Sequence, residues 1–126
     1  MPCPSDLSAE VSTKTEAFGE GGSWVNMKCN KLVRDRVPEI IEQKGGQPVV
    51  HVADDSEYWQ KLKEKLQEEL NEFSKGENIE EIADILEVIE AICEYRNFDQ
   101  AQVRMIKDKK AAERGKFKDR IILEQT

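Results

Sequence analysis

The stretch that decides the fold is residues 57–96, EYWQKLKEKLQEELNEFSKGENIEEIADILEVIEAICEYR. Apolar residues recur in it at spacings of three and four, which is the period of an α-helix. The pattern predicts one helix from about Glu57 to Lys75, closed by Gly76, and a second from about Ile79 to Tyr95, capped by Asn78. Because the connection is short, we expect the two helices to pack together in a bundle.

Shorter elements flank this pair. The apolar pattern of residues 34–44 predicts a short helix that ends at Gly45, and a third long helix is expected from about Asp99 to Arg114. The β-branched residues of the segments Pro48–Ala53 and 119–123 predict two short strands that could pair. We therefore expect an all-α helical bundle with, at most, a minor two-stranded β element.

The ends of the chain differ in character from its middle. Residues 1–26 are rich in Ser, Glu, Gly and Thr, which is typical of a disordered extension, and Met27 resembles an ordinary protein start. We expect residues 1–26 to be a disordered extension and 27–126 to be the folded domain; one hypothesis is that Met27 is the initiator, which would make residues 1–26 an artefact. No apolar signal segment precedes the domain, and no apolar run approaches the roughly 20 residues of a membrane span. These features predict a cytoplasmic protein that does not bind membranes.

The chain has three cysteines, at positions 3, 29 and 93, with no C-x-x-C spacing. Neither a disulfide framework nor a zinc site is therefore predicted, and we expect reduced thiols. The chain has one histidine, His51, so a metal site with several histidine ligands is excluded. It lies within the predicted strand and is interpreted as a strand residue.

The net charge of −7 is unevenly distributed along the 126 residues. Residues 56–94 hold four basic and twelve acidic residues, whereas residues 95–126 hold nine basic and five acidic residues. This division does not match the continuous basic face of a nucleic-acid-binding protein. It suits a site in which acidic side chains hold a cation and basic side chains hold an anion. With 38% hydrophobic residues the core is lean, which is typical of helices with one apolar face or of a core that a partner subunit completes.

Several carboxylates occupy unusual positions on the predicted helices. On a helical wheel Glu69 borders the apolar stripe of its helix, Glu81 lies inside the apolar half of the next helix, and Asp84 borders that half. Burying an unpaired carboxylate costs several kcal/mol, so such a group needs a cation, hydrogen bonds or a proton. Oxygen ligands without histidine or cysteine suit Mg²⁺ or Mn²⁺. The competing interpretation is a Glu-rich helix face that is merely solvated.

Two segments resemble a known signature. Glu68-Glu69-Leu70-Asn71-Glu72, followed by Glu81-Ile82-Ala83-Asp84, is similar to the E-E-x-x-E … E-x-x-D pattern of the all-α nucleoside triphosphate pyrophosphohydrolases, the MazG-like superfamily. Residues 30–41 and 114–123 resemble the opening and the C-terminal segment of one small branch, the predicted house-cleaning proteins that are similar to phosphoribosyl-ATP pyrophosphohydrolase.

The resemblance implies an all-α homodimer or tetramer that uses Mg²⁺, or Mn²⁺, to cleave the α–β phosphoanhydride of noncanonical nucleoside triphosphates, releasing a monophosphate and pyrophosphate. By motif match, the metal ligands would be Glu69, Glu72, Glu81 and Asp84, the catalytic residues Glu68 and Glu69, and the phosphate contacts Lys31, Arg34, Lys65 and Arg120. Two alternatives stay open: phosphoribosyl-ATP as the substrate, and a non-enzymatic helical module for oligomerisation or interaction.

Overall fold

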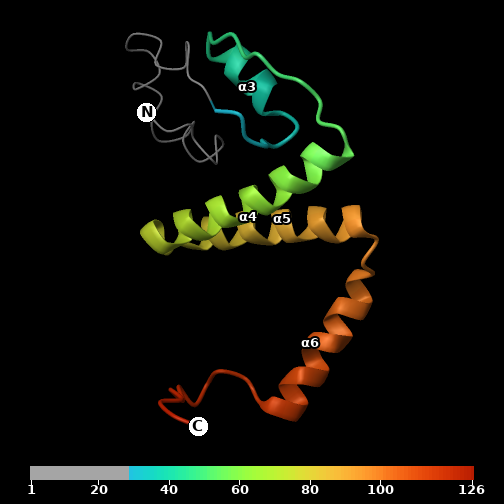
Figure 1. Ribbon diagram of the computed structural model, residues 1–126. Helices are drawn as coiled ribbons and strands as arrows, with labels where there is room; N and C mark the ends of the chain where they lie inside the picture. Colours follow the sequence, from blue (N-terminus) through green and yellow to red (C-terminus); the bar gives the residue numbers. More distant parts are fainter. Residues whose placement is uncertain (1–28) are drawn as a thin grey trace. The chain divides into compact units, whose positions relative to one another are not determined.

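The computed structural model describes residues 29–126, and Figure 1 shows that these residues form α-helices joined by irregular segments. The helices are α3 (Val37–Gln43), α4 (Asp55–Gly76), α5 (Ile79–Arg96) and α6 (Gln100–Arg114). The expected all-α class is confirmed. Among these helices none combines the length and the apolar character needed to cross a membrane. The expected extension at 1–26 lies outside the described residues.

The predicted β element is wrong. Within residues 29–126 neither Pro48–Ala53 nor 119–123 forms a strand. Val49 is 99% exposed and Val52 is 96% exposed, and Ile121 is likewise exposed. β-Branched residues favour an extended backbone, but a strand also needs hydrogen bonds to a neighbouring strand, and sequence-local preference does not supply them. His51 is therefore not a strand residue.

The helix α4 begins and ends at recognisable signals. Asp54 is its N-cap, and its Oδ1 accepts a hydrogen bond from the Glu57 backbone N–H at 2.9 Å. The helix ends at Gly76, after which Glu77 adopts a left-handed conformation with φ 52° and its backbone N–H donates to the Phe73 carbonyl at 2.7 Å. The reversal of the chain is therefore made at Glu77.

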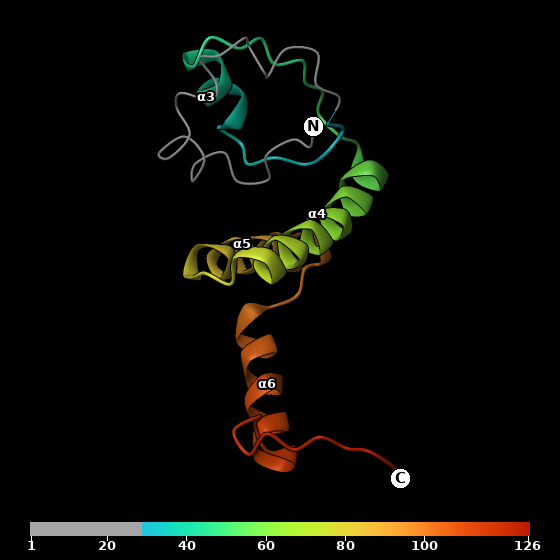
Figure 2. The same ribbon diagram turned by 90° about the vertical axis from the view of Figure 1, so that its left-hand side faces the viewer.

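The helix α5 starts directly after this turn. The Asn78 side-chain oxygen accepts a hydrogen bond from the Glu81 backbone N–H at 3.0 Å, which confirms the predicted cap. Figures 1 and 2 show α4 and the first part of α5 side by side in both views. Since only Glu77 and Asn78 join them, the two helices run antiparallel.

The chain divides into two compact units, one ending at Ile89 and the other beginning at Glu90. Among residues 29–89 of the first unit the buried residues are Val37, Leu62 and Val88, together with three charged residues. In the second unit Asp99 caps α6 by accepting a hydrogen bond from the Ala101 backbone N–H at 3.0 Å. Within residues 100–114, which form α6, no residue is buried.

The second unit also holds Cys93, which is a free thiol and is buried. In the first unit Cys29 is disulfide-bonded. The expectation that every cysteine is reduced is therefore wrong for Cys29, since a disulfide depends on spatial proximity that the spacing of cysteines along the chain does not reveal.

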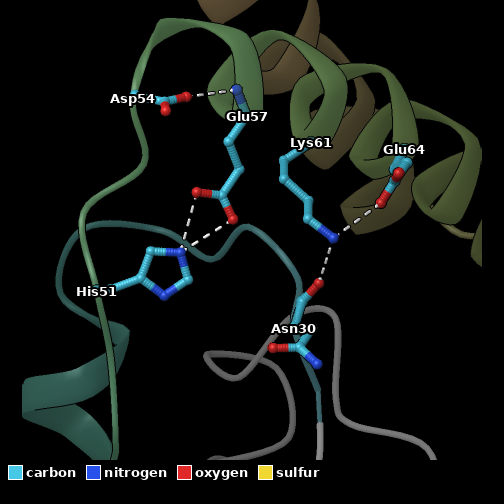
Figure 3. Close-up of polar contacts among 6 residues, drawn as sticks. All are labelled: Asn30, His51, Asp54, Glu57, Lys61 and Glu64. Carbon is cyan, nitrogen blue, oxygen red and sulfur yellow. Dashed lines mark hydrogen bonds and ion pairs between the residues drawn. The ribbon is translucent and has the colours of Figure 1, made fainter.

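Polar contacts tie the segment before α3 to the start of α4. Figure 3 shows that the Lys61 ammonium donates to the Asn30 carbonyl, at 2.6 Å, and also reaches the Glu64 carboxylate, at 3.2 Å. Nearby, His51 Nε2 lies 2.9 Å from a carboxylate oxygen of Glu57. These contacts hold residue 30, and with it the following Lys31, beside the first half of α4.

Candidate metal centre

Three carboxylates meet between α4 and the first turns of α5. Glu69 on α4 and Glu81 and Asp84 on α5 each offer one oxygen atom, and these atoms all lie within 4.8 Å of one another. We call these three residues the carboxylate cluster. The antiparallel hairpin explains the meeting, because Glu69 lies about two turns before the connection and the two α5 residues lie within the first two turns after it.

Burial makes the ionised form of the cluster's carboxylates energetically unfavourable. The Glu69 side chain is 1% exposed, and within the described residues neither of its buried carboxylate oxygens accepts a hydrogen bond. The pKa of Glu69 is raised to about 7, chiefly by burial; Lys65 lowers it, and the charges of Asp84, Glu68 and Glu81 add to the rise. A buried carboxylate with no hydrogen-bond donor is a group that a cation would stabilise.

Basic side chains already face these acids. The Lys65 Nζ lies 3.5 Å from a Glu69 oxygen, and both side chains are nearly fully buried. The Arg34 Nη2 donates to Asp84 Oδ1 at 2.8 Å. The Lys31 Nζ donates to a Glu68 carboxylate oxygen at 3.1 Å. Three of the four residues predicted to contact phosphate therefore lie against residues predicted to be catalytic or to bind metal.

The remaining predicted site residues lie elsewhere or at the margin. Glu68 is not in the carboxylate cluster; its side chain is 25% exposed and it lies between Lys31 and Lys65, at 3.1 Å and 3.7 Å. The Glu72 side chain is 38% exposed and lies 3.9 Å from the Lys75 Nζ, outside the cluster. Arg120 belongs to the second unit and is exposed.

Sequence reasoning missed how the basic residues are used. Lys31 and Arg34 are 37 and 50 positions away from the acids they contact, so no helical periodicity reveals these pairs. It also missed that Lys65 would be buried, although its i,i+4 spacing to Glu69 was a signal for the pair. Finally, the Asn78 side chain that caps α5 accepts its hydrogen bond from the backbone N–H of Glu81, so the cap also positions the backbone of this cluster residue.

The donor set fits a hard divalent cation. It consists of carboxylate oxygens from three residues, with no histidine or cysteine in the cluster, and such oxygens are the ligands that Mg²⁺ and Mn²⁺ prefer. Within residues 29–126 the Glu69 oxygens accept no hydrogen bond, although the Lys65 Nζ lies 3.5 Å from one of them, and this independently favours a further cation beside them. Glu69, Glu81 and Asp84 are therefore the residues that would hold such an ion.

Comparison with known proteins adds one partial match. An uncharacterized protein of Mycolicibacterium smegmatis (strain ATCC 700084 / mc(2)155) is 50% identical to this chain over 42 residues. The match covers 33% of this chain and 43% of that protein, so it spans less than half the length of the relative. The chain matches no protein-family profile. No solved structure matches it significantly.

Proposed function

We propose that the protein is a Mg²⁺-dependent nucleotide pyrophosphohydrolase that cleaves the α–β phosphoanhydride of a nucleoside triphosphate, as in the removal of noncanonical nucleotides. The observation that carries the proposal is the buried Glu69, whose two oxygens accept no hydrogen bond within the described residues and which meets Glu81 and Asp84 within 4.8 Å. The similarity of residues 68–84 to the signature of MazG-like enzymes supports the same reaction.

The residues around the cluster have separable roles in this proposal. Glu69, Glu81 and Asp84 would hold Mg²⁺, which supplies charge neutralisation at the transferred phosphoryl group and favours ionisation of the attacking water. The Glu68 side chain is 25% exposed and directly precedes the cluster residue Glu69, so it would accept a proton from that water. Lys31 and Arg34 reach the cluster from the segment before α3 and would contact phosphate oxygens.

Self-association as a homodimer or tetramer belongs to the proposal. Four apolar residues of α5 share one face of the helix and are exposed in the first unit: Ile79, Ile82, Leu86 and Ile89. We call them the α5 stripe. An exposed apolar stripe of this kind is typical of a surface that another subunit covers.

The decisive experiment is a substrate panel with product analysis. Canonical, deoxy and oxidised nucleoside triphosphates, and phosphoribosyl-ATP, are incubated with Mg²⁺, and the products are separated by anion exchange. Monophosphate and pyrophosphate are expected, and the order of the rates identifies the substrate class. Diphosphate and orthophosphate would contradict cleavage between the α and β phosphates. Glu81→Gln should abolish turnover, and Glu80→Gln, an exposed neighbour on the same turn, should not.

The α5 stripe also favours a second candidate, a non-enzymatic module for helical interaction. The two candidates differ in metal binding. The enzyme requires divalent binding that is lost in Glu81→Gln and in Asp84→Asn, and calorimetric titration with Mg²⁺ or Mn²⁺ measures it directly. Absence of both metal binding and turnover would leave the interaction module as the function.

A further inference from the structure

Asp84 is neutralised by a cation from outside the helical hairpin. The Arg34 guanidinium donates to Asp84 Oδ1 at 2.8 Å across 50 positions of sequence. The Asp84 side chain is 9% exposed, whereas the Arg34 side chain is 46% exposed. The carboxylate is thus fixed in the interior of the first unit, and the guanidinium reaches it from the surface.

Lys65 provides the contrast. Its side chain is 7% exposed, and it pairs with Glu69 at i,i+4 and with Glu68 at i,i+3 on its own helix. Moving the Lys65 ammonium away would leave Glu68 and Glu69 without this buried counter-charge. Arg34 instead lies in an irregular segment before α3. Its charge is already partly hydrated, so exchanging one anionic partner for another costs less desolvation than it would for Lys65.

A divalent cation and Arg34 would compete for the same carboxylate. Both are positive, and both are stabilised by Asp84, so the ion disfavours the guanidinium at its present place. The displaced guanidinium needs a new anion, and phosphate oxygens suit it because its planar donors bind them in pairs. The buried Glu69, which accepts no hydrogen bond within the described residues, is the separate sign that a cation enters here.

Resting on the proposed function, we infer that Arg34 is an exchangeable counter-ion, which neutralises Asp84 until a divalent cation takes that carboxylate and which then binds a phosphate oxygen of the substrate. Arg34 therefore couples the two binding events. The metal releases the guanidinium for phosphate, and phosphate prevents its return to Asp84. By linkage, each ligand raises the affinity for the other by the same factor.

Calorimetry on two arginine variants tests this inference. Mn²⁺ is titrated, with no phosphate present, into the wild type, Arg34→Gln and Arg36→Gln. Arg36 is a matched control, because its loss removes the same charge two positions away, but its side chain is 79% exposed and it pairs with Glu39 at 2.9 Å. Arg34→Gln should bind Mn²⁺ about tenfold more tightly than Arg36→Gln, which is the factor expected when a competing charged hydrogen bond is removed.

The second arm measures inorganic pyrophosphate binding at saturating Mn²⁺. Arg34→Gln should bind pyrophosphate about tenfold more weakly than Arg36→Gln does. Tighter Mn²⁺ with unchanged pyrophosphate, or unchanged Mn²⁺ with weaker pyrophosphate, would overturn the exchange, since each leaves only one of its two halves. Weaker binding of both would make Arg34 a structural residue. A wild type that binds no Mn²⁺ would refute the metal centre and the proposed function with it.

A measurement on the wild type covers the case in which Arg34→Gln does not fold. The side-chain N–H signals of Arg34 are followed by nuclear magnetic resonance during titration with Mg²⁺ and then with pyrophosphate. They should shift with Mg²⁺ and shift again with pyrophosphate, whereas those of Arg36 should stay unchanged. Arg34 signals that respond to neither ligand, while the Asp84 backbone signal responds to Mg²⁺, would refute the exchange and leave the metal centre intact.

Discussion

Replacing Glu69 by glutamine should stabilise the metal-free protein at alkaline pH. Burial raises the pKa of Glu69 from 4.5 to about 7. Because the pKa of Glu69 is higher in the folded protein than in the unfolded chain, folding favours the protonated carboxyl over the carboxylate. Its contribution to stability is therefore fully present below about pH 4.5 and is lost as pH rises through about 7. At about 1.36 kcal/mol per pKa unit, the shift corresponds to about 3 kcal/mol.

The assay is urea unfolding in the presence of a chelator, at fixed protein concentration, at about pH 4 and about pH 8.5. At the alkaline pH, Glu69→Gln should exceed the wild type by about 3 kcal/mol in the free energy of unfolding. At the acidic pH the two should nearly agree, because glutamine resembles the protonated glutamate in size and charge. Glu72→Gln is the control; its side chain is 38% exposed, and it should stay within about 0.5 kcal/mol of the wild type at both pH values.

A stability difference between Glu69→Gln and the wild type that is the same at both pH values would refute the reasoning. It would mean that Glu69 does not titrate between them and that the burial of its charge is compensated. Metal addition gives an independent check. At about a hundredfold excess over the dissociation constant, Mg²⁺ should stabilise the wild type by about 2.7 kcal/mol at the alkaline pH. It should leave Glu69→Gln largely unchanged.

Three further predictions concern the frame around the cluster. Asn78→Ala removes the acceptor for the Glu81 backbone N–H and should lower the free energy of unfolding by about 1 kcal/mol, while Asn78→Asp keeps an acceptor and should lose much less. Gly45 has φ 93° and open space where a Cβ would lie. Gly45→Ala should therefore lower the free energy of unfolding, measured by thermal melting, by about 1 kcal/mol through backbone conformation alone. Leu86 is 59% exposed on the α5 stripe, and Leu86→Glu should convert the proposed dimer or tetramer to monomer in analytical ultracentrifugation; an unchanged assembly would exclude this stripe from the interface.

The helices were predictable because their signals are local. The bounds of α4 and α5 depend on apolar periodicity and on the caps at Asp54 and Asn78, all of which lie within or beside the helices. The buried face was less predictable. Leu70 belongs to the apolar stripe of the wheel but is 43% exposed, whereas Glu69 is 1% exposed. A wheel gives the direction of a side chain, and only the neighbouring helix decides which directions are covered.

The acids of the candidate site were predictable from helical periodicity, whereas its cations were expected only from the family resemblance and their ion pairs were not predicted. Glu69, Glu81 and Asp84 stand out because helical periodicity places carboxylates at or inside apolar faces. Arg34 and Lys31 gave no comparable signal, because their contacts depend on the path of an irregular segment. The predicted strands failed for the related reason that strand pairing joins distant parts of the chain.

The two-residue connection between α4 and α5 also bears on the order in which the chain folds. Glu69 and Asp84 are only fifteen positions apart, so their encounter is a low-contact-order event that accompanies formation of the hairpin. The contacts from Lys31 and Arg34 span 37 and 50 positions and close much larger loops. Carboxylate repulsion therefore arises when the hairpin forms, before Lys31 and Arg34 dock, so formation of the hairpin is the step that a divalent cation would accelerate.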